Sequence, residues 1–122
     1  MAFKLGSEKR GFKHSGNVEI IRTPLDKGTI AEANNDGTIS ISSHVKPGSA
    51  LYKKAIKHEM AHIEQMEDGR ANYGDNWVMW EDKIYFRKEE DGVSVIDGPN
   101  GRWPEGHPNH PWEAEAIKAE KQ

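Results

Sequence analysis

SALYKKAIKHEMAHIEQMEDG, residues 49–69, is the segment on which the predicted fold rests. It begins with a serine, a residue preferred at helix N-caps, and contains strong helix formers without glycine or proline until Gly69. Glycine directly after a helical run is a common C-terminal stop, because it adopts the left-handed conformation without strain. The segment therefore predicts a helix over residues 50–68, the clearest helix in the chain.

This helix contains His58-Glu59-Met60-Ala61-His62, an HExxH pattern. Two histidines four residues apart lie about one helical turn apart, so both imidazoles can reach one zinc ion. Glu59 lies one step round the helix, where its carboxylate can take a proton from a water molecule that the metal activates. The motif therefore predicts His58 and His62 as ligands of one catalytic Zn²⁺ and Glu59 as the general base.

The context of the motif also favours metal binding. A projection at about 100° per residue places His58 and His62 on one arc with Leu51, Ala55 and Met66, while three lysines of the helix fall on another side. One histidine on such an arc is commonly a hydrogen-bonded core residue. Two of them would be costly to bury unless they are paired or bound to a metal. We therefore prefer a metal site to a surface helix without metal.

A catalytic zinc site needs a third protein ligand and leaves a fourth position for water. In the short helix expected at the C-terminus, the same projection turns Glu113 toward the apolar arc. Glu113 is therefore the favoured third ligand, and His107 and His110 are the main alternatives. Asp68 stands where a metzincin-like site places its ligand, but Gln65 occupies the position at which such a site needs glycine.

The rest of the chain predicts short strands. Asn34-Asn35-Asp36-Gly37 is a strong hairpin turn, and Pro111 suits the first position of the final helix, which we expect over residues 112–121. Residues 72–74 read as a loop and residues 98–111 as a turn-rich connection. The expected strands cover residues 18–22, 29–33, 38–42, 77–80, 83–88 and 93–96.

Length and composition limit the classes of protein. A chain of 122 residues with 34% hydrophobic residues forms one domain, residues 1–122, around a small core, and residues 1–16 are expected to be a mobile arm. The absence of cysteine restricts zinc ligands to histidine and carboxylate. A net charge of -3 argues against nucleic acid as a partner. Because the sequence shows no signal peptide and no membrane span, we expect the protein in the cytoplasm. We also expect it to be a monomer.

The pair of motifs resembles a known family. HExxH at 58–62, followed by Pro111-Trp112-Glu113-Ala114-Glu115-Ala116, is similar to the gluzincin metallopeptidases, whose second-helix motif begins with the glutamate ligand. The resemblance implies an α+β, zincin-like fold: a small antiparallel or mixed sheet, an active-site helix behind it, and a short C-terminal helix carrying Glu113. It also implies that residues 38–42 form the edge of a substrate cleft. The chain departs from the family at Ile117, where an Asp or Asn would brace a zinc-binding histidine.

The resemblance implies hydrolysis of a peptide or protein substrate. Asn72-Tyr73-Gly74-Asp75 and Pro111-Trp112-Glu113 also resemble small HExxH proteins of tailed bacteriophages, which would place the protein in the host cytoplasm or the virion. The alternative is a catalytically silent zinc-binding protein with a structural or interaction role on the same scaffold. Four residues are candidates for stabilising an oxyanion, and the sequence does not choose among them: His107, His110, Tyr73 and Tyr85.

Overall fold

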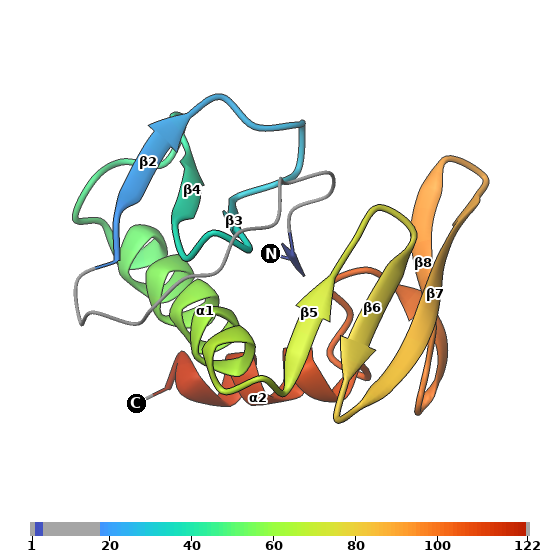
Figure 1. The fold of residues 1–122 in the computed structure, drawn as a ribbon. Helices are drawn as coiled ribbons and strands as arrows, with labels where there is room; N and C mark the ends of the chain where they lie inside the picture. Colours follow the sequence, from blue (N-terminus) through green and yellow to red (C-terminus); the bar gives the residue numbers. More distant parts are fainter. Residues whose placement is uncertain (1, 4–17, 122) are drawn as a thin grey trace.

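The computed structural model describes residues 2, 3 and 18–121 of the chain, and it confirms the α+β class (Figure 1). Apart from Ala2 and Phe3, the expected mobile arm over residues 1–16 lies outside the described residues. The elements in chain order are β1 (Ala2–Phe3), β2 (Ile20–Thr23), β3 (Ala31–Ala33), β4 (Ile39–Ser42), α1 (Ala50–Glu67), β5 (Ala71–Tyr73), β6 (Trp77–Trp80), β7 (Lys83–Glu90), β8 (Val93–Gly98), β9 (Gly101–Pro104) and α2 (Pro111–Ala119).

The first sheet is mixed and has the strand order β1-β3-β4-β2. β3 and β4 form the expected antiparallel hairpin through Asn34 and Gly37, and Gly37 has a positive φ of 89°. β1 adds to β3 and β2 adds to β4, both in parallel. β4 is therefore an inner strand, with all four residues buried. The expectation that residues 38–42 form a free cleft edge is wrong, because neighbouring strands use both edges of β4.

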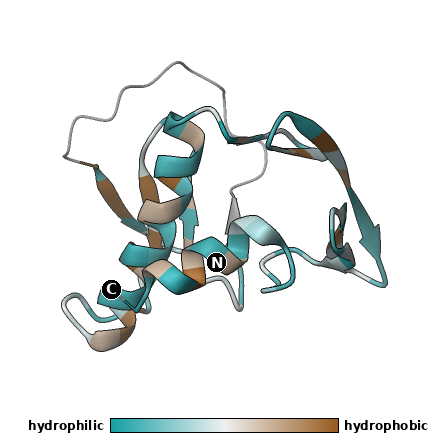
Figure 2. Ribbon diagram, turned by 90° about the horizontal axis from the view of Figure 1, so that it is seen from below, coloured by the Kyte–Doolittle hydropathy of each residue, from teal (hydrophilic) through white to brown (hydrophobic). Residues whose placement is uncertain are grey.

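The second sheet is an antiparallel meander in which β5 to β9 lie in chain order. Two of its strands were not expected. β5 replaces the predicted loop around residue 73, and β9 replaces part of the turn-rich connection. Both segments are short and carry turn-forming residues, so pairing with β6 and β8 outweighs their local preference. The long β7–β8 hairpin projects from the molecule, and its surface is mainly hydrophilic with a few exposed hydrophobic residues, among them Ile84, Phe86 and Val93 (Figure 2).

α1 begins and ends as the sequence predicts. The Oγ of Ser49 accepts a hydrogen bond from the backbone N–H of Tyr52 at 3.1 Å. At the other end Gly69 has a φ of 76°, its N–H donates to the Met66 carbonyl, and the next N–H donates to the Gln65 carbonyl. This pair of bonds is a Schellman motif, which satisfies the last carbonyls and turns the chain directly into β5.

The main core lies where α1, α2 and the two sheets meet. Trp112 at the start of α2 is 1% exposed and packs near Trp80 and Tyr85, with ring centroids 6.0 and 6.3 Å away. The prediction that Leu51 faces the core is wrong. Leu51 is 45% exposed and lines a surface cavity, whereas its neighbour Tyr52 packs against the first sheet. Among the described residues, neither helix is long and apolar enough to cross a membrane.

A buried ion pair between Arg87 and Glu105 stabilises the second sheet. Arg87, in β7, donates two hydrogen bonds to Glu105, at 3.1 and 2.8 Å, and two more to the carbonyls of Gly74 and Asp75, at 2.6 and 3.1 Å. Glu105 also accepts a bond from Ser94 at 3.0 Å. The side chain of Arg87 is only 5% exposed. This guanidinium therefore ties the β5–β6 loop to the segment that follows β9.

We expect Arg87→Ala to lower the free energy of unfolding by about 3–5 kcal/mol, because it leaves the Glu105 carboxylate without its buried partner. Urea denaturation followed by tryptophan fluorescence measures the loss. The matched control is Arg102→Ala, whose exposed guanidinium pairs with Asp97 and Glu90. The control should cost much less, since exposed ion pairs contribute little. Equal losses in the two variants would contradict the role of Arg87.

Candidate metal centre

His58, His62 and Glu113 come together in the structure as the sequence predicts. Both histidines point their Nε2 atoms at the same oxygen, Oε1 of Glu113, at 2.8 Å from His58 and 3.2 Å from His62. The three residues form a buried group whose ligand atoms lie within 4.8 Å of one another. α1 supplies the two imidazoles one turn apart, and α2, which packs against it, supplies the carboxylate in its first turn.

The donor set and its spacing fit a divalent metal ion. Ligand atoms about 2.0–2.1 Å from a tetrahedral zinc ion lie roughly 3.3 Å from one another. The separations of 2.8 and 3.2 Å between each Nε2 and Glu113 Oε1 are close to that value, and all the ligand atoms lie within 4.8 Å of one another. In addition, Oε2 of Glu113 is buried and has no hydrogen-bond partner among the residues that the structure describes. A cation bound between the three residues would compensate this carboxylate.

Glu59 is placed beside this group and is fully buried, with 0% exposure. Neither of its carboxylate oxygens has a hydrogen-bond partner among the described residues. A buried carboxylate without a partner is costly, so such an arrangement is rare in a purely structural position. The residue expected to be the general base is therefore held close to the three candidate ligands with both oxygens uncommitted.

The pKa values show strong coupling within the site. Burial raises the pKa of Glu59 to about 8, against the lowering influence of His62 and with a further rise from Glu113. Burial would also raise the pKa of Glu113, but His62 and His58 lower it to about 2. For His62 the effect of burial is outweighed by the Glu113 carboxylate, which raises its pKa to about 9. The site thus favours a positive charge between Glu113 and the imidazoles.

The outer nitrogens of both imidazoles also have partners, which the sequence analysis missed. Nδ1 of His58 lies 2.5 Å from Oε2 of Glu120, and Nδ1 of His62 lies 2.9 Å from Oε1 of Gln65. A sequence signal existed for Glu120, because it stands seven residues after Glu113 and so projects from the same side of a helix. A signal also existed for Gln65, because it stands three residues after His62 in the same predicted helix, where side chains are neighbours.

The two alternative histidine ligands lie outside the group of three. His110 is the N-cap residue of α2, and it stacks on Trp112 and bonds the Trp103 carbonyl through Nε2 at 3.1 Å. Gly98 packs so closely against this ring that a Cβ atom there would lie 2.8 Å from Nδ1. His107 stacks on Trp103 and accepts a hydrogen bond from the backbone N–H of Asn109. Both histidines therefore make structural contacts at the N-terminal end of α2.

The tyrosine candidates and Asp68 also have other surroundings. Tyr73 is 1% exposed, and its hydroxyl accepts a bond from the Asn35 N–H and donates to the Ala33 carbonyl. Tyr85 is partly buried and packs against the main core. Asp68 is the C-cap residue of α1 and lies at the surface. Tyr73 thus joins the two sheets, a role that leaves its hydroxyl engaged away from the candidate metal centre.

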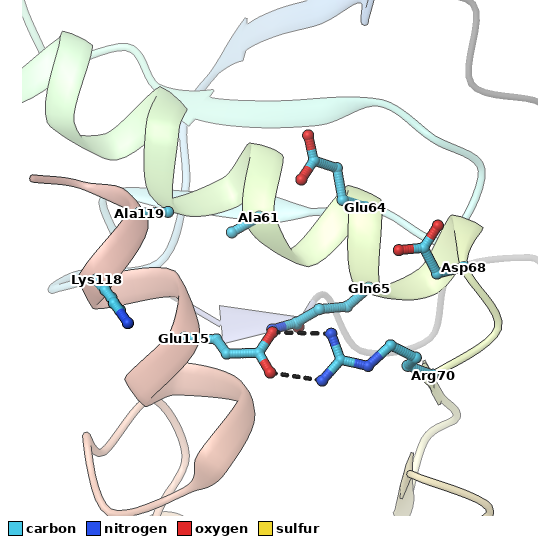
Figure 3. A pocket seen from close by; sticks show the side chains of 8 residues that line it. All are labelled: Ala61, Glu64, Gln65, Asp68, Arg70, Glu115, Lys118 and Ala119. Atoms are coloured by element: carbon cyan, nitrogen blue, oxygen red, sulfur yellow. Dashed lines mark hydrogen bonds and ion pairs between the residues drawn. The ribbon is translucent and has the colours of Figure 1, made fainter. Parts of the chain in front are cut away.

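A surface cavity of about 280 Å³ is lined by residues of α1 and α2 together with Asp68 and Arg70 (Figure 3). The three candidate ligands are not part of its lining. Its lining includes Gln65, whose Oε1 faces His62, together with Arg70 and Glu115. Figure 3 shows Arg70 and Glu115 joined by two parallel bonds, at 3.1 and 2.5 Å, across this cavity. Because Gln65 also contacts the candidate ligand His62, the cavity lies next to a residue that supports the metal centre.

Comparison of the chain with protein-family models, with curated proteins and with solved structures gave no match. The residues of the site and the motifs of the sequence are therefore the features that indicate a function.

We expect the purified protein to bind one divalent metal ion per chain and His62→Ala to lose most of that binding, because it removes one of three ligands. Metal analysis by mass spectrometry after dialysis against a small excess of zinc measures the stoichiometry. His44→Ala is the control, since His44 is an exposed histidine outside the group of three. Equal metal content in both variants would exclude the site.

Proposed function

We propose that the protein is a zinc-dependent metallopeptidase of the gluzincin type, with a zincin-like fold and a peptide or protein substrate. The observation that carries the proposal is the buried group of His58, His62 and Glu113, beside which the Glu59 carboxylate has no hydrogen-bond partner within the described part of the chain. Two imidazoles and one carboxylate are the protein ligands of a well-known class of catalytic zinc site, in which the fourth position stays open.

The chemistry of the donor atoms supports zinc as the metal. Three ligands of mixed imidazole and carboxylate type, without thiolate, suit zinc in a hydrolytic site better than calcium or magnesium, which prefer oxygen ligands. When bound, zinc supplies Lewis acidity: it polarises a carbonyl group and lowers the pKa of a water molecule.

The chain's own contribution to the reaction is proton transfer by Glu59. Its carboxylate accepts one proton from the attacking water, whose oxygen forms a bond to the carbonyl carbon of the substrate. When the C–N bond breaks, Glu59 returns that proton to the leaving nitrogen. The position of Glu59 suits this role, because its carboxylate lies beside the three candidate ligands and no hydrogen-bond partner among the described residues competes for the proton.

The second candidate is a catalytically silent zinc-binding protein on the same scaffold. It is favoured by the burial of the site, because His58 is 2% exposed and the other three side chains are completely covered. Since β4 has no free edge, an extended substrate also has no pairing partner at the strand where the family resemblance would put it. A silent site would share the zinc stoichiometry of a peptidase but would have no use for Glu59.

Glu59→Gln separates the two functions. We expect the variant to keep one zinc ion per chain, because Glu59 is not among the ligands, and to lose turnover by at least about 100-fold, because an amide cannot accept the proton. A library of quenched fluorescent peptides measures turnover in zinc-loaded wild type and variant. Glu64→Gln is the matched control, because it makes the same change at an exposed glutamate of α1. Zinc-loaded wild type that cleaves no peptide would favour the silent protein.

A further inference from the structure

Each candidate zinc-binding histidine presents one nitrogen to the site and the other to an acceptor oxygen. His58 lies between two carboxylates of α2, with Glu113 at Nε2 and Glu120 at Nδ1. His62 lies between Glu113 at Nε2 and Gln65 at Nδ1. A neutral imidazole carries its proton on one nitrogen only, and an acceptor at Nδ1 holds the proton there. In a neutral ring the lone pair of Nε2 would then face the metal centre, where a bound zinc ion would replace the hydrogen bond that each ring makes to Glu113 here.

The orientation of the Gln65 amide follows from its other contacts. Its nitrogen donates to the backbone carbonyl of Trp112 at 3.0 Å and to Oε1 of Glu115 at 3.2 Å. Both of these atoms can only accept, so the NH₂ group must lie on that side and the oxygen must face His62. Arg70 holds Glu115 in turn with two bonds, at 3.1 and 2.5 Å (Figure 3). The Gln65 oxygen that faces His62 is thus held in place by Glu115, which is itself held by the surface residue Arg70.

Glu120 is held by its position on α2. It stands about two helical turns beyond Glu113 and about 20° from it round the axis, so one face of α2 delivers both carboxylates to the α1 helix. Its side chain is only 7% exposed, and its second oxygen lies 3.7 Å from the ammonium group of Lys54. Glu120 therefore has a defined place beside His58.

We propose that Glu120 and Gln65 are positioning residues that fix the tautomer and the ring orientation of His58 and His62 for zinc. The inference rests on the proposed zinc site. Oxygens that accept from the outer nitrogen of a zinc-binding imidazole commonly raise both metal affinity and activity. Here the two supports differ in kind, because one is a carboxylate from α2 and the other is an amide from α1. Glu120 also supplies the brace that Ile117 cannot provide.

The test compares the zinc affinity of full-length wild type with that of Glu120→Ala, Glu120→Gln and Gln65→Met, measured by competition with a chromogenic chelator. We expect Glu120→Ala and Gln65→Met to bind zinc about 10- to 100-fold more weakly. Glu120→Gln keeps an acceptor oxygen and should lose less than Glu120→Ala. Glu64→Ala, at an exposed position of α1, is the control and should match wild type.

Imidazole nitrogen chemical shifts, recorded by NMR on the zinc-loaded proteins, separate positioning from a general loss of stability. In Glu120→Ala the Nδ1 signal of His58 should change while that of His62 stays, and Gln65→Met should show the reverse. Unchanged affinities in both variants, or weaker binding without a selective change at the facing histidine, would overturn this inference while the zinc site stands. Wild type that binds no zinc would overturn the proposed function and this inference together.

Discussion

The burial of one carboxylate oxygen between two imidazoles is the constraint on which the rest of the site depends. Glu113 is fully buried, and its Oε1 is shared by His58 at 2.8 Å and His62 at 3.2 Å. A buried charge is tolerated only when it is paired and hydrogen-bonded, so α2 has one acceptable depth and rotation against α1. A shift of one residue along α2 would turn the carboxylate about 100° away from both rings.

The two ends of α2 hold this position. A helix of nine residues is marginal by itself, so its placement must come from contacts with its neighbours. At its start, the ring of His110 stacks on Trp112 at 4.7 Å and bonds the Trp103 carbonyl, which ties α2 to β9. At its end, Glu120 contacts His58. The second sheet therefore acts on the site through α2, although none of its strands supplies a candidate ligand.

Sequence periodicity predicted the parts of the site that depend on one helix at a time. The turn between His58 and His62, and the inward face of Glu113, follow from 3.6 residues per turn alone. It failed where the answer depends on how elements meet. Glu120 reaches His58 because α2 packs against α1, contacts from α2 fix the direction of the Gln65 amide, and β4 is an inner strand because β2 pairs with it in parallel. The prediction for Leu51 was wrong because a helical projection does not say which positions of the apolar arc the sheet covers.

The cost of placing Glu59 also bears on the choice between a peptidase and a silent zinc protein. Three candidate ligands account for His58, His62 and Glu113, and a structural site would add a fourth ligand to close the tetrahedron. Instead the next carboxylate on α1 is buried with both oxygens unpartnered among the described residues, close enough to Glu113 that each raises the other's cost of ionisation. A fold gains no stability from such a group. In the proposed peptidase, proton transfer accounts for its presence beside the three ligands, whereas a closed structural site has no need of it.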